Sequence, residues 1–303
     1  MLDIKKTESM NTVNIVGVLK ELDIEEKVTA DKRGYVQGKA IIAVDHEVDG
    51  AMVESEIPVR MFSMKKKKDG TDNAVYAAIV RMKENFTSLA AAETPSQASR
   101  VAINSGQLQE NSWYDKTKGV VRTGFQISSN FMNKAKDEQN NCATFELTGV
   151  IGQISEETDR NGDETGNVLV KLIVVGYPRN NNGYVEVINL VAKSPLAVEH
   201  IRNNWNQGDT VRVAGIVNIS YHVTTWKEEQ GFGDAIERTK TETKKELIIT
   251  SGSATGFDEE NSYDSDSIKI ALNERSARLE ELKTKGSAPQ VKKATSNSNG
   301  FGF

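Results

Sequence analysis

An internal repeat constrains the fold of this 303-residue chain more than any other feature of its sequence. Residues 13–44, moved forward by 132 positions, align with residues 145–176 without a gap and share eight identities over 32 positions. One of these identities is Lys39 with Lys171. Because the copies lie more than a hundred residues apart, they indicate two tandem domains rather than a solenoid, whose repeats span about 20–50 residues.

Each copy predicts the same order of secondary structure. Apolar residues at alternate positions, such as Val36 and Ile42, are typical of strands with one buried face. The spacing of Ile79 and Met82 indicates a helix after the third strand. The expected strands are 12–22, 35–44, 56–64, 100–108 and 117–129 in the first copy and 144–154, 167–176, 184–192, 209–220 and 240–250 in the second, with helices at 74–85 and 195–205.

Three strands, one helix and two further strands are the element order of an OB-fold, a five-stranded Greek-key barrel. We therefore predict an all-β protein with two tandem OB-fold five-stranded barrels, each with one helix, followed by a C-terminal helix and a disordered tail. The first domain is expected at 1–137 and the second at 138–256. Residues 257–303 are expected to form an acidic linker, a short helix at 267–285 and a flexible tail, since the last residues contain too few apolar side chains to fold.

Composition excludes several classes of protein. The single cysteine, Cys142, cannot form an internal disulfide, which favours a reducing compartment, and no apolar run approaches the ~18 residues of a membrane span. Three histidines and one cysteine give no zinc spacing. We predict a cytoplasmic protein (the host cytoplasm if phage-encoded) that is not an enzyme and needs no metal or cofactor. Its net charge of −5 means that any nucleic-acid binding would rest on local basic patches.

Two segments resemble the OB-fold family of single-stranded DNA-binding proteins, particularly its phage-encoded members. One is the opening strand at 14–19. The other is the strand at 209–217, which follows Gly208 and matches the family pattern Gly-Asp-x-Val-x-Val-x-Gly. The resemblance covers about residues 12–250. It implies a protein that coats single-stranded DNA without sequence choice during DNA replication or recombination, with a tail that recruits replication proteins.

Single-stranded nucleic acid is held by cations along a groove, which meet the phosphates, and by aromatic faces, which stack on the bases. Lys39 and Lys171 share one repeated position on the strand face opposite the apolar stripe, and we expect both to contact phosphate. Trp113 and Trp226 both fall between the fourth and fifth strands, in segments where OB-folds contact ligands. The complete set of expected nucleic-acid contacts is Tyr35, Lys39, Arg60, Phe62, Lys65, Lys67, Trp113, Tyr114, Lys116, Arg122, Phe125, Lys171, Tyr177, Arg179, Tyr184, Arg212, Tyr221, Trp226 and Lys227.

Several alternatives stay open from the sequence. Phe62 and Phe125 could fill the barrel interior instead of meeting bases, and the lysine run 65–68 could be a solvated hairpin tip. Phe301 and Phe303 could be a hook that binds a partner or a flexible end with no role. RNA is a second candidate ligand. The alternative function is a protein-docking scaffold, in a virion or a replication complex, whose contact would be made by the terminal helix and phenylalanines.

Overall fold

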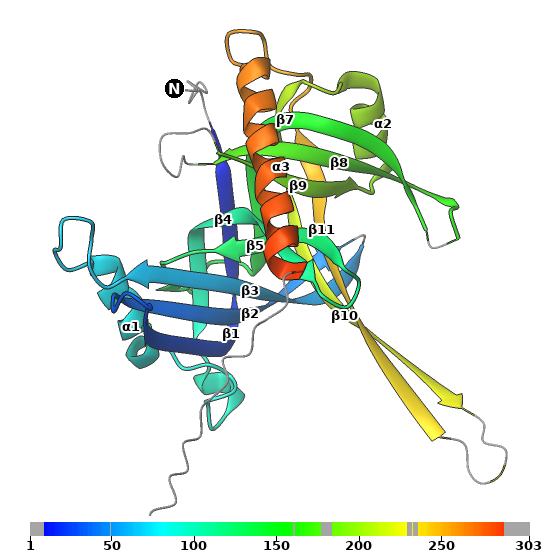
Figure 1. Cartoon of the computed structure of the whole chain (residues 1–303). Coiled ribbons are helices and arrows are strands. Elements are labelled where there is room, and N and C mark those ends of the chain that lie inside the picture. The colour runs from blue at the N-terminus through cyan, green and yellow to red at the C-terminus, as the bar shows by residue number, and fades with distance from the viewer. Residues whose placement is uncertain are drawn as a thin grey trace, which may run out of the picture.

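The computed structural model describes residues 9–48, 50–159, 161–176, 184–228, 232 and 236–287. Strands make up most of this part of the chain (Figure 1). In chain order, the elements are β1 (Asn11–Val28), β2 (Gly34–Val48), β3 (Ala51–Met64), α1 (Ala74–Asn85), the short 3-10 helix η1 (Pro95–Gln97), β4 (Arg100–Asp115), β5 (Val120–Ser128), β6 (Asn133–Lys134), β7 (Cys142–Thr158), β8 (Glu164–Gly176), β9 (Tyr184–Ala192), α2 (Pro195–Asn204), β10 (Thr210–Glu228), β11 (Ile236–Gly252) and α3 (Ser265–Ser287).

Two five-stranded barrels with the same topology account for most of the strands. In the first unit, residues 11–128, β1 pairs with β2 and β4, β2 pairs with β3, and β5 closes the barrel between β4 and β3. In the second unit, residues 142–252, β7 pairs with β8 and β10, and β11 closes the barrel between β10 and β9. The closing pair is parallel in both units, and a helix joins the third strand to the fourth. This topology confirms the predicted all-β OB-like fold.

The repeated glycine of each opening strand lies where two strands approach closely. A Cβ atom on Gly17 would stand 2.2 Å from the carbonyl oxygen of Ala43, and one on Gly149 would stand 2.6 Å from that of Ile173. Such distances exclude any side chain, so glycine is required at both sites.

The two copies nevertheless differ in strand register by two residues. Lys39 lies opposite Asp23 of β1, whereas Lys171 lies opposite Gln153 of β7, a position that the repeat aligns with Glu21. Because side chains alternate along a strand with a period of two, this shift leaves every residue on its own face of the sheet. Both lysines therefore point away from the barrel interior, and both are exposed.

Both helices that join a third strand to a fourth are capped by a side chain and anchored in the core. Asn73 accepts a hydrogen bond from the backbone at the start of α1, and Ile79 of that helix is fully buried. Ser194 caps α2 in the same way, and Ile201 and the following Trp205 are buried. Each helix thus closes one end of a barrel with apolar side chains.

The two units share one sheet and one hydrophobic core. The first half of β1 pairs with β4 of its own barrel on one edge and with β7 on the other, from Asn11 opposite Leu147 to Val16 opposite Cys142. Buried side chains of both barrels form a single continuous cluster. The predicted division at 137/138 falls between β6 and β7 and remains a prediction, as do the other domain boundaries.

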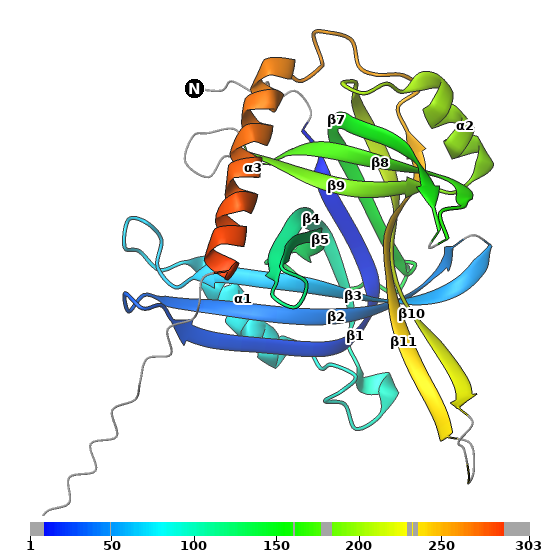
Figure 2. The ribbon, with the colours of Figure 1, turned by 45° about the vertical axis from the view of Figure 1, so that its right-hand side comes forward.

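Helix α3 packs across the outward face of the second unit and reaches the β4–β5 hairpin of the first (Figures 1 and 2). Ile268 and Ala271 are buried against β7, β8 and β9 in a cluster with Ile173 and Val185. The helix is therefore docked, and it begins two residues before the predicted range of 267–285 and ends two residues after it. None of the helices in the described ranges is long and apolar enough to span a bilayer.

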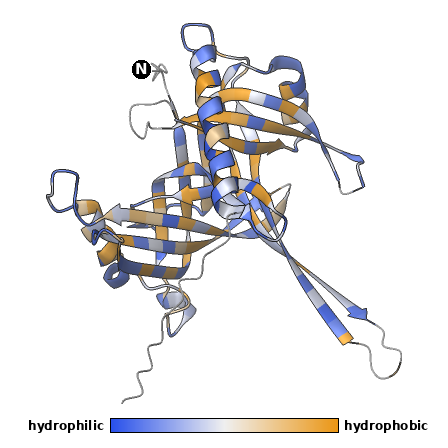
Figure 3. Cartoon of the chain, in the orientation of Figure 1, coloured by the Kyte–Doolittle hydropathy of each residue, from blue (hydrophilic) through white to orange (hydrophobic). Residues whose placement is uncertain are grey.

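Two hairpins are longer than the sequence predicts. Trp113 and Tyr114 lie on β4 and pair in register with β5, and Tyr221 and Trp226 lie on β10 and pair with β11. The interpretation of these segments as loops was therefore wrong. The end of the β10–β11 hairpin projects away from the second unit as a ribbon (Figure 1), which we call the arm, residues 221–228 and 236–245. Hydrophobic residues concentrate in the barrels, whereas the arm is largely hydrophilic (Figure 3).

Candidate nucleic-acid interface

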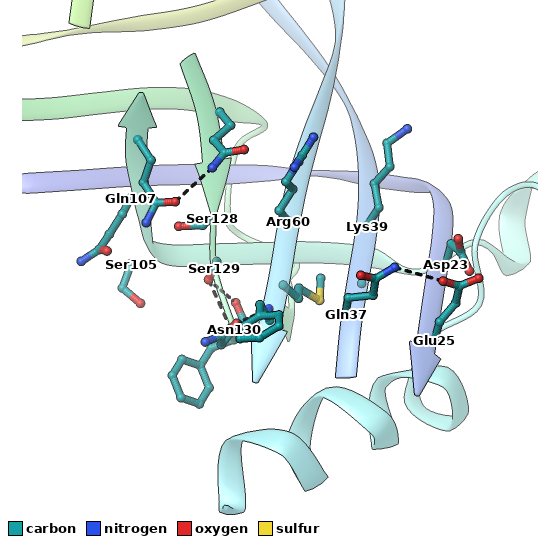
Figure 4. Close-up of a pocket in the computed structure, with 16 residues that line it drawn as sticks. Asp23, Glu25, Gln37, Lys39, Arg60, Ser105, Gln107, Ser128, Ser129 and Asn130 are labelled. Atoms are coloured by element: carbon teal, nitrogen blue, oxygen red, sulfur yellow. Dashed lines mark hydrogen bonds between the residues drawn. The ribbon is translucent and has the colours of Figure 1, made fainter. Parts of the chain in front are cut away.

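A groove of about 1020 Å³ runs over the outward face of the first unit (Figure 4). Its floor is formed by neighbouring outward residues of β1, β2, β3, β5 and β4. The lining residues are Asp23, Glu25, Gln37, Gly38, Lys39, Arg60, Met61, Phe62, Ser105, Gln107, Gln109, Gln126, Ser128, Ser129, Asn130 and Phe131. We call this groove the first-unit groove.

Lys39 and Arg60 form the basic centre of the first-unit groove. The register of β2 and β3 places them directly opposite each other, and Figure 4 shows both side chains extending to the same side of their strands. Neither one makes an ion pair or a side-chain hydrogen bond with any residue that the structure describes. By contrast, Arg122 pairs with Asp115 at 2.6 Å. Like charges that face each other across two strands repel, so a bound anion would be stabilised between them.

Two exposed phenylalanines lie beside these cations. Phe62 follows Arg60 by two residues on β3 and so shares its face. Its side chain is 55% exposed, and that of Phe131 is 54% exposed. Tyr35 supports the Phe62 ring with its own ring, whose centroid is 5.6 Å away. Asn130 accepts a hydrogen bond of 2.9 Å from the backbone N–H of Phe62, which ties the segment that carries Phe131 to the end of β3.

The wall of the first-unit groove that β4 and β5 form is lined by side-chain amides. Gln126 of β5 donates a hydrogen bond of 3.3 Å to Gln109 of β4, and the Gln126 Oε1 atom is buried without a partner among the described residues. Gln107 extends the same wall. Amide groups both donate and accept hydrogen bonds, so this wall can meet the edges of bases or sugars.

Acidic residues mark one rim of the groove. Asp23 and Glu25 line it from β1. Hydrogen bonds from Lys27 and Gln37 lower the pKa of the Glu25 carboxyl below its ordinary value, so this carboxylate stays ionised at neutral pH. A polyanion would therefore be kept on the side of β3 and β5, away from β1.

The remaining first-unit candidates lie outside the groove. Lys65 stands 5.8 Å from the ring of Tyr76, and Lys67 is exposed in the turn that follows β3. Phe125 is partly buried against the hydrophobic core. A separate group belongs to the tip of the β4–β5 hairpin: Trp113, Tyr114, Lys116 and Arg122.

The four candidate side chains of that hairpin differ in how far other residues of the protein contact them. The ring of Tyr114 lies against Gly286 at the end of α3, where a Cβ atom would stand 2.4 Å from the ring. Trp113 is about half exposed. Arg122 is paired, as described above, and Lys116 is exposed in the turn.

The structure does not gather the second-unit candidates into one site. Lys171 is exposed and donates a hydrogen bond of 2.7 Å to Gln153. Tyr184 lies under the guanidinium of Arg278 of α3, 4.4 Å from its ring centroid. Arg212 lies 3.6 Å from Glu146 on the β7–β10 side of the barrel. The candidates Tyr177, Arg179, Phe301 and Phe303 lie outside the described residues.

The last candidates are on the arm or at its base. Tyr221 and Trp226 are both about half exposed. An odd and an even position on one strand point to opposite faces, so these two rings do not form a single platform. Lys227 lies opposite Glu237 in the same ribbon.

Phe131 is the exposed aromatic residue of the first-unit groove that sequence reasoning missed. It follows the fifth strand within the polar segment Ser-Ser-Asn-Phe-Met-Asn. An isolated aromatic residue in such a polar segment was the available signal.

Two closed five-stranded barrels, the first with a groove over its second and third strands, define this chain as an OB-fold protein. The family model described as YorF matches residues 9–285, so the chain belongs to the YorF family. No curated protein sequence matches it.

Two solved structures similar to this chain are of the single-stranded DNA binding protein from Thermus aquaticus. A deletion and substitution variant of that protein has 11% identity and a TM-score of 0.49, with 82% of this chain and 96% of that chain covered. The wild-type protein has 12% identity and a TM-score of 0.46, with 81% of this chain and 92% of that chain covered.

Proposed function

We propose that this protein binds single-stranded nucleic acid, and DNA in particular, in the first-unit groove. The observation that carries the proposal is the pair Lys39 and Arg60, which face each other across β2 and β3 and form no ion pair with any described residue, beside the exposed rings of Phe62 and Phe131. Cations for phosphates and rings for bases are the two elements that such binding needs.

The spacing of these groups suggests how a strand would lie. Arg60 and Phe62 are two residues apart on β3, about 7 Å along the strand, which is comparable with one extended nucleotide. A phosphate would lie between Lys39 and Arg60, and a neighbouring base would stack on Phe62. Stacking contributes about 1–3 kcal/mol per base and does not depend on which base it is.

The biological role that we propose follows from this chemistry. Phosphate contacts and stacking favour binding without strong sequence choice, which suits a protein that covers single strands during DNA replication or recombination. The protein would act as a binding protein and not as an enzyme. Replication proteins that meet the C-terminal tail are proposed as further partners.

The proposal can be tested by fluorescence anisotropy with the full-length protein and a labelled oligo-dT. We expect binding that weakens steeply with salt, because each phosphate contact releases counterions and contributes about −0.7 to the slope of log K against log salt. A duplex of the same length should bind more weakly. An RNA oligomer in a parallel titration measures the preference between the two single strands.

A matched pair of variants locates the site. Lys39→Ala should weaken binding and reduce the salt slope by about 0.7. Lys171→Ala, which removes the repeated lysine of the second unit, should change neither quantity. Absence of any binding at about 50 mM salt would contradict the proposed function and favour the protein-docking scaffold.

A further inference from the structure

We propose that the first unit alone holds the nucleic acid, and that the equivalent face of the second unit is a platform on which the chain docks its own segments. This inference rests on the proposed function. It predicts one binding site per chain, although the chain contains two barrels.

The first step is a comparison of equivalent positions. The repeat aligns Lys39 with Lys171, and strand register then aligns their β3 and β9 partners: Arg60 corresponds to Asn189. The same register aligns Phe62 with Val191. The second unit therefore lacks both the second cation and the aromatic ring at the positions where the first unit has them.

The second step is the burial of this face near Val191. Val191 packs with Leu169 and Ile248 of the second unit and with Val48 and Val53 of the β2–β3 hairpin. It is 5% exposed, whereas the equivalent Phe62 is more than half exposed. The tip of a hairpin from the first barrel thus covers the place where a base would stack on the second.

Polar contacts fix this hairpin in position. The Ser55 hydroxyl accepts a hydrogen bond of 3.2 Å from the backbone N–H of Ile219 and donates one of 3.3 Å to the side chain of Asn218. Ser55 and Asn218 are both buried. Opening the hairpin would break both of these hydrogen bonds between buried groups, which is costly.

The third step concerns α3, which covers the other end of this face of the second unit. Residues of β8 and β9 that point outward, including Ile173 and Val185, pack with Ile268 and Ala271 of α3. Arg278 of α3 donates a hydrogen bond of 3.3 Å to the carbonyl of Val185. An apolar face of this kind suits a helix and has no affinity for phosphate.

Between the β2–β3 hairpin and α3, the outward face of β8 and β9 presents the cross-strand pair Lys171 and Asn189. Lys171 already donates to Gln153, and both residues are exposed. Among the described residues, Lys171 has neither a second cation nor an aromatic ring at the positions equivalent to Arg60 and Phe62, so it does not provide the combination that strand binding requires.

The test compares two double variants of the full-length chain. Lys39→Ala with Arg60→Ala should weaken binding of a labelled dT oligomer at least tenfold and reduce the salt slope by about 1.4, for two phosphate contacts. Lys171→Ala with Asn189→Ala should leave affinity within twofold of the unmodified protein and leave the slope unchanged. All four residues are exposed, and a thermal melt of each variant verifies that it is folded.

Stoichiometry provides an independent readout. Calorimetric titration with a dT oligomer of about 12 nucleotides, a length within the range that one OB-fold covers, should saturate at one oligomer per chain. Two oligomers per chain, or an equal loss of affinity in both double variants, would overturn the inference while leaving the proposed function intact. If the unmodified protein binds no oligomer, the proposed function fails and this inference fails with it.

Discussion

At the scale of single residues, the first-unit groove combines charges that repel with rings that are exposed. Lys39 and Arg60 face each other without acids between them, and Phe62 offers most of one ring to solvent. Both arrangements cost free energy in the unbound protein. A bound strand would offset these costs, since a phosphate neutralises the two cations and a base covers the ring.

The charge pair predicts a change in binding with little change in stability. Lys39→Gln should leave the free energy of unfolding nearly unchanged, because it removes both the repulsion from Arg60 and the attraction of Asp23 on the other neighbouring strand, while the affinity for oligo-dT falls. Urea denaturation and anisotropy measure the two quantities. Lys171→Gln is the control, since its partner Asn189 is neutral and no repulsion is relieved. A clear loss of stability in Lys39→Gln would contradict this account of the pair.

The aromatic contact predicts a change in affinity without a change in salt dependence. Phe62→Ala should weaken oligo-dT binding by about 1–3 kcal/mol, the contribution of one stacked base, because no phosphate contact is lost. Trp226→Ala removes a ring of similar exposure from the arm and should have little effect. Anisotropy over a salt series separates the two outcomes, and a larger effect from Trp226→Ala would place the bases on the arm.

At the scale of elements, α3 ties the two units together. It packs on β8 and β9 of the second unit, and its Arg275 forms a bidentate ion pair with Glu110 of β4, with distances of 2.6 and 2.8 Å. Glu110 also accepts a hydrogen bond of 3.0 Å from the backbone of Val187. The helix thus fixes the hairpin whose residues form the amide wall of the first-unit groove.

The packing of α3 can be measured with two isoleucines on the same helix. Ile268 is 4% exposed and Ile270 is 48% exposed. Ile268→Ala should lower the free energy of unfolding by about 2–5 kcal/mol, because it removes buried methyl groups and leaves a cavity. Ile270→Ala should change it by less than about 0.5 kcal/mol. Equal effects in urea denaturation would mean that the helix is not docked as described.

The Glu110–Arg275 pair predicts how α3 responds to pH. Burial acts to raise the pKa of Glu110, but the hydrogen bonds from Arg275, Val187 and Ser112 outweigh it and hold the pKa below its ordinary value. A carboxyl with a lowered pKa stabilises the folded state above its unfolded pKa, and this stability is lost as the pH falls through the folded value. Protection of α3 amides from hydrogen exchange should therefore hold at neutral pH and fall below about pH 4.3.

A variant tests the cause of this dependence. In Arg275→Ala, the largest of the hydrogen bonds that oppose burial is gone, so the pKa of Glu110 should rise relative to that in the unmodified protein. Acidification should then weaken the docking of α3 less than it does in the unmodified protein. The same fall in protection in both proteins would show that Glu110 does not control the helix.

At the scale of the whole molecule, the two barrels are parts of one body. The pairing of β1 with β7 and the continuous core leave no flexible connection between the units. Helix α3 and the β2–β3 hairpin add two further bridges. The sequence therefore contains two copies of one fold, whereas the packing joins these copies into a single cooperative structure.

We expect the two units to unfold together. Far-UV circular dichroism follows the strands of both barrels. The fluorescence of the buried Trp205, measured in a variant with Trp113→Phe and Trp226→Phe, follows the second unit. Coincident transitions by these two probes in urea are the signature of two-state unfolding. Two separate transitions would instead support independent domains with the predicted boundary at 137/138.

Much of this architecture can be predicted from the sequence, because the barrel strands have one buried face. Their alternating apolar residues and the repeat together give the element order, and the helix at 74–85 is predicted with its observed bounds. The arm could not be predicted in this way. Both of its faces are exposed along most of its described length, so no apolar alternation marks residues 221–228 and 236–239 as strands.

The candidate site is predicted only in part, for a different physical reason. Lys39, Arg60 and Phe62 are found from their residue types and their strand positions. The packing of the β2–β3 hairpin and α3 on the second unit cannot be predicted from the sequence. Leu169 and Val191 have the pattern of strand residues whatever packs against them. Which of two similar faces is free depends on contacts between distant segments, and no local pattern records them.

The pairing of β1 with β7 has a mechanical consequence. A molecule whose two halves are joined by a shared ladder of hydrogen bonds has no hinge and cannot change its own curvature. If many copies line one strand, any bend or kink in that filament has to arise at the joints between neighbouring molecules, and its stiffness will depend on how closely they are spaced.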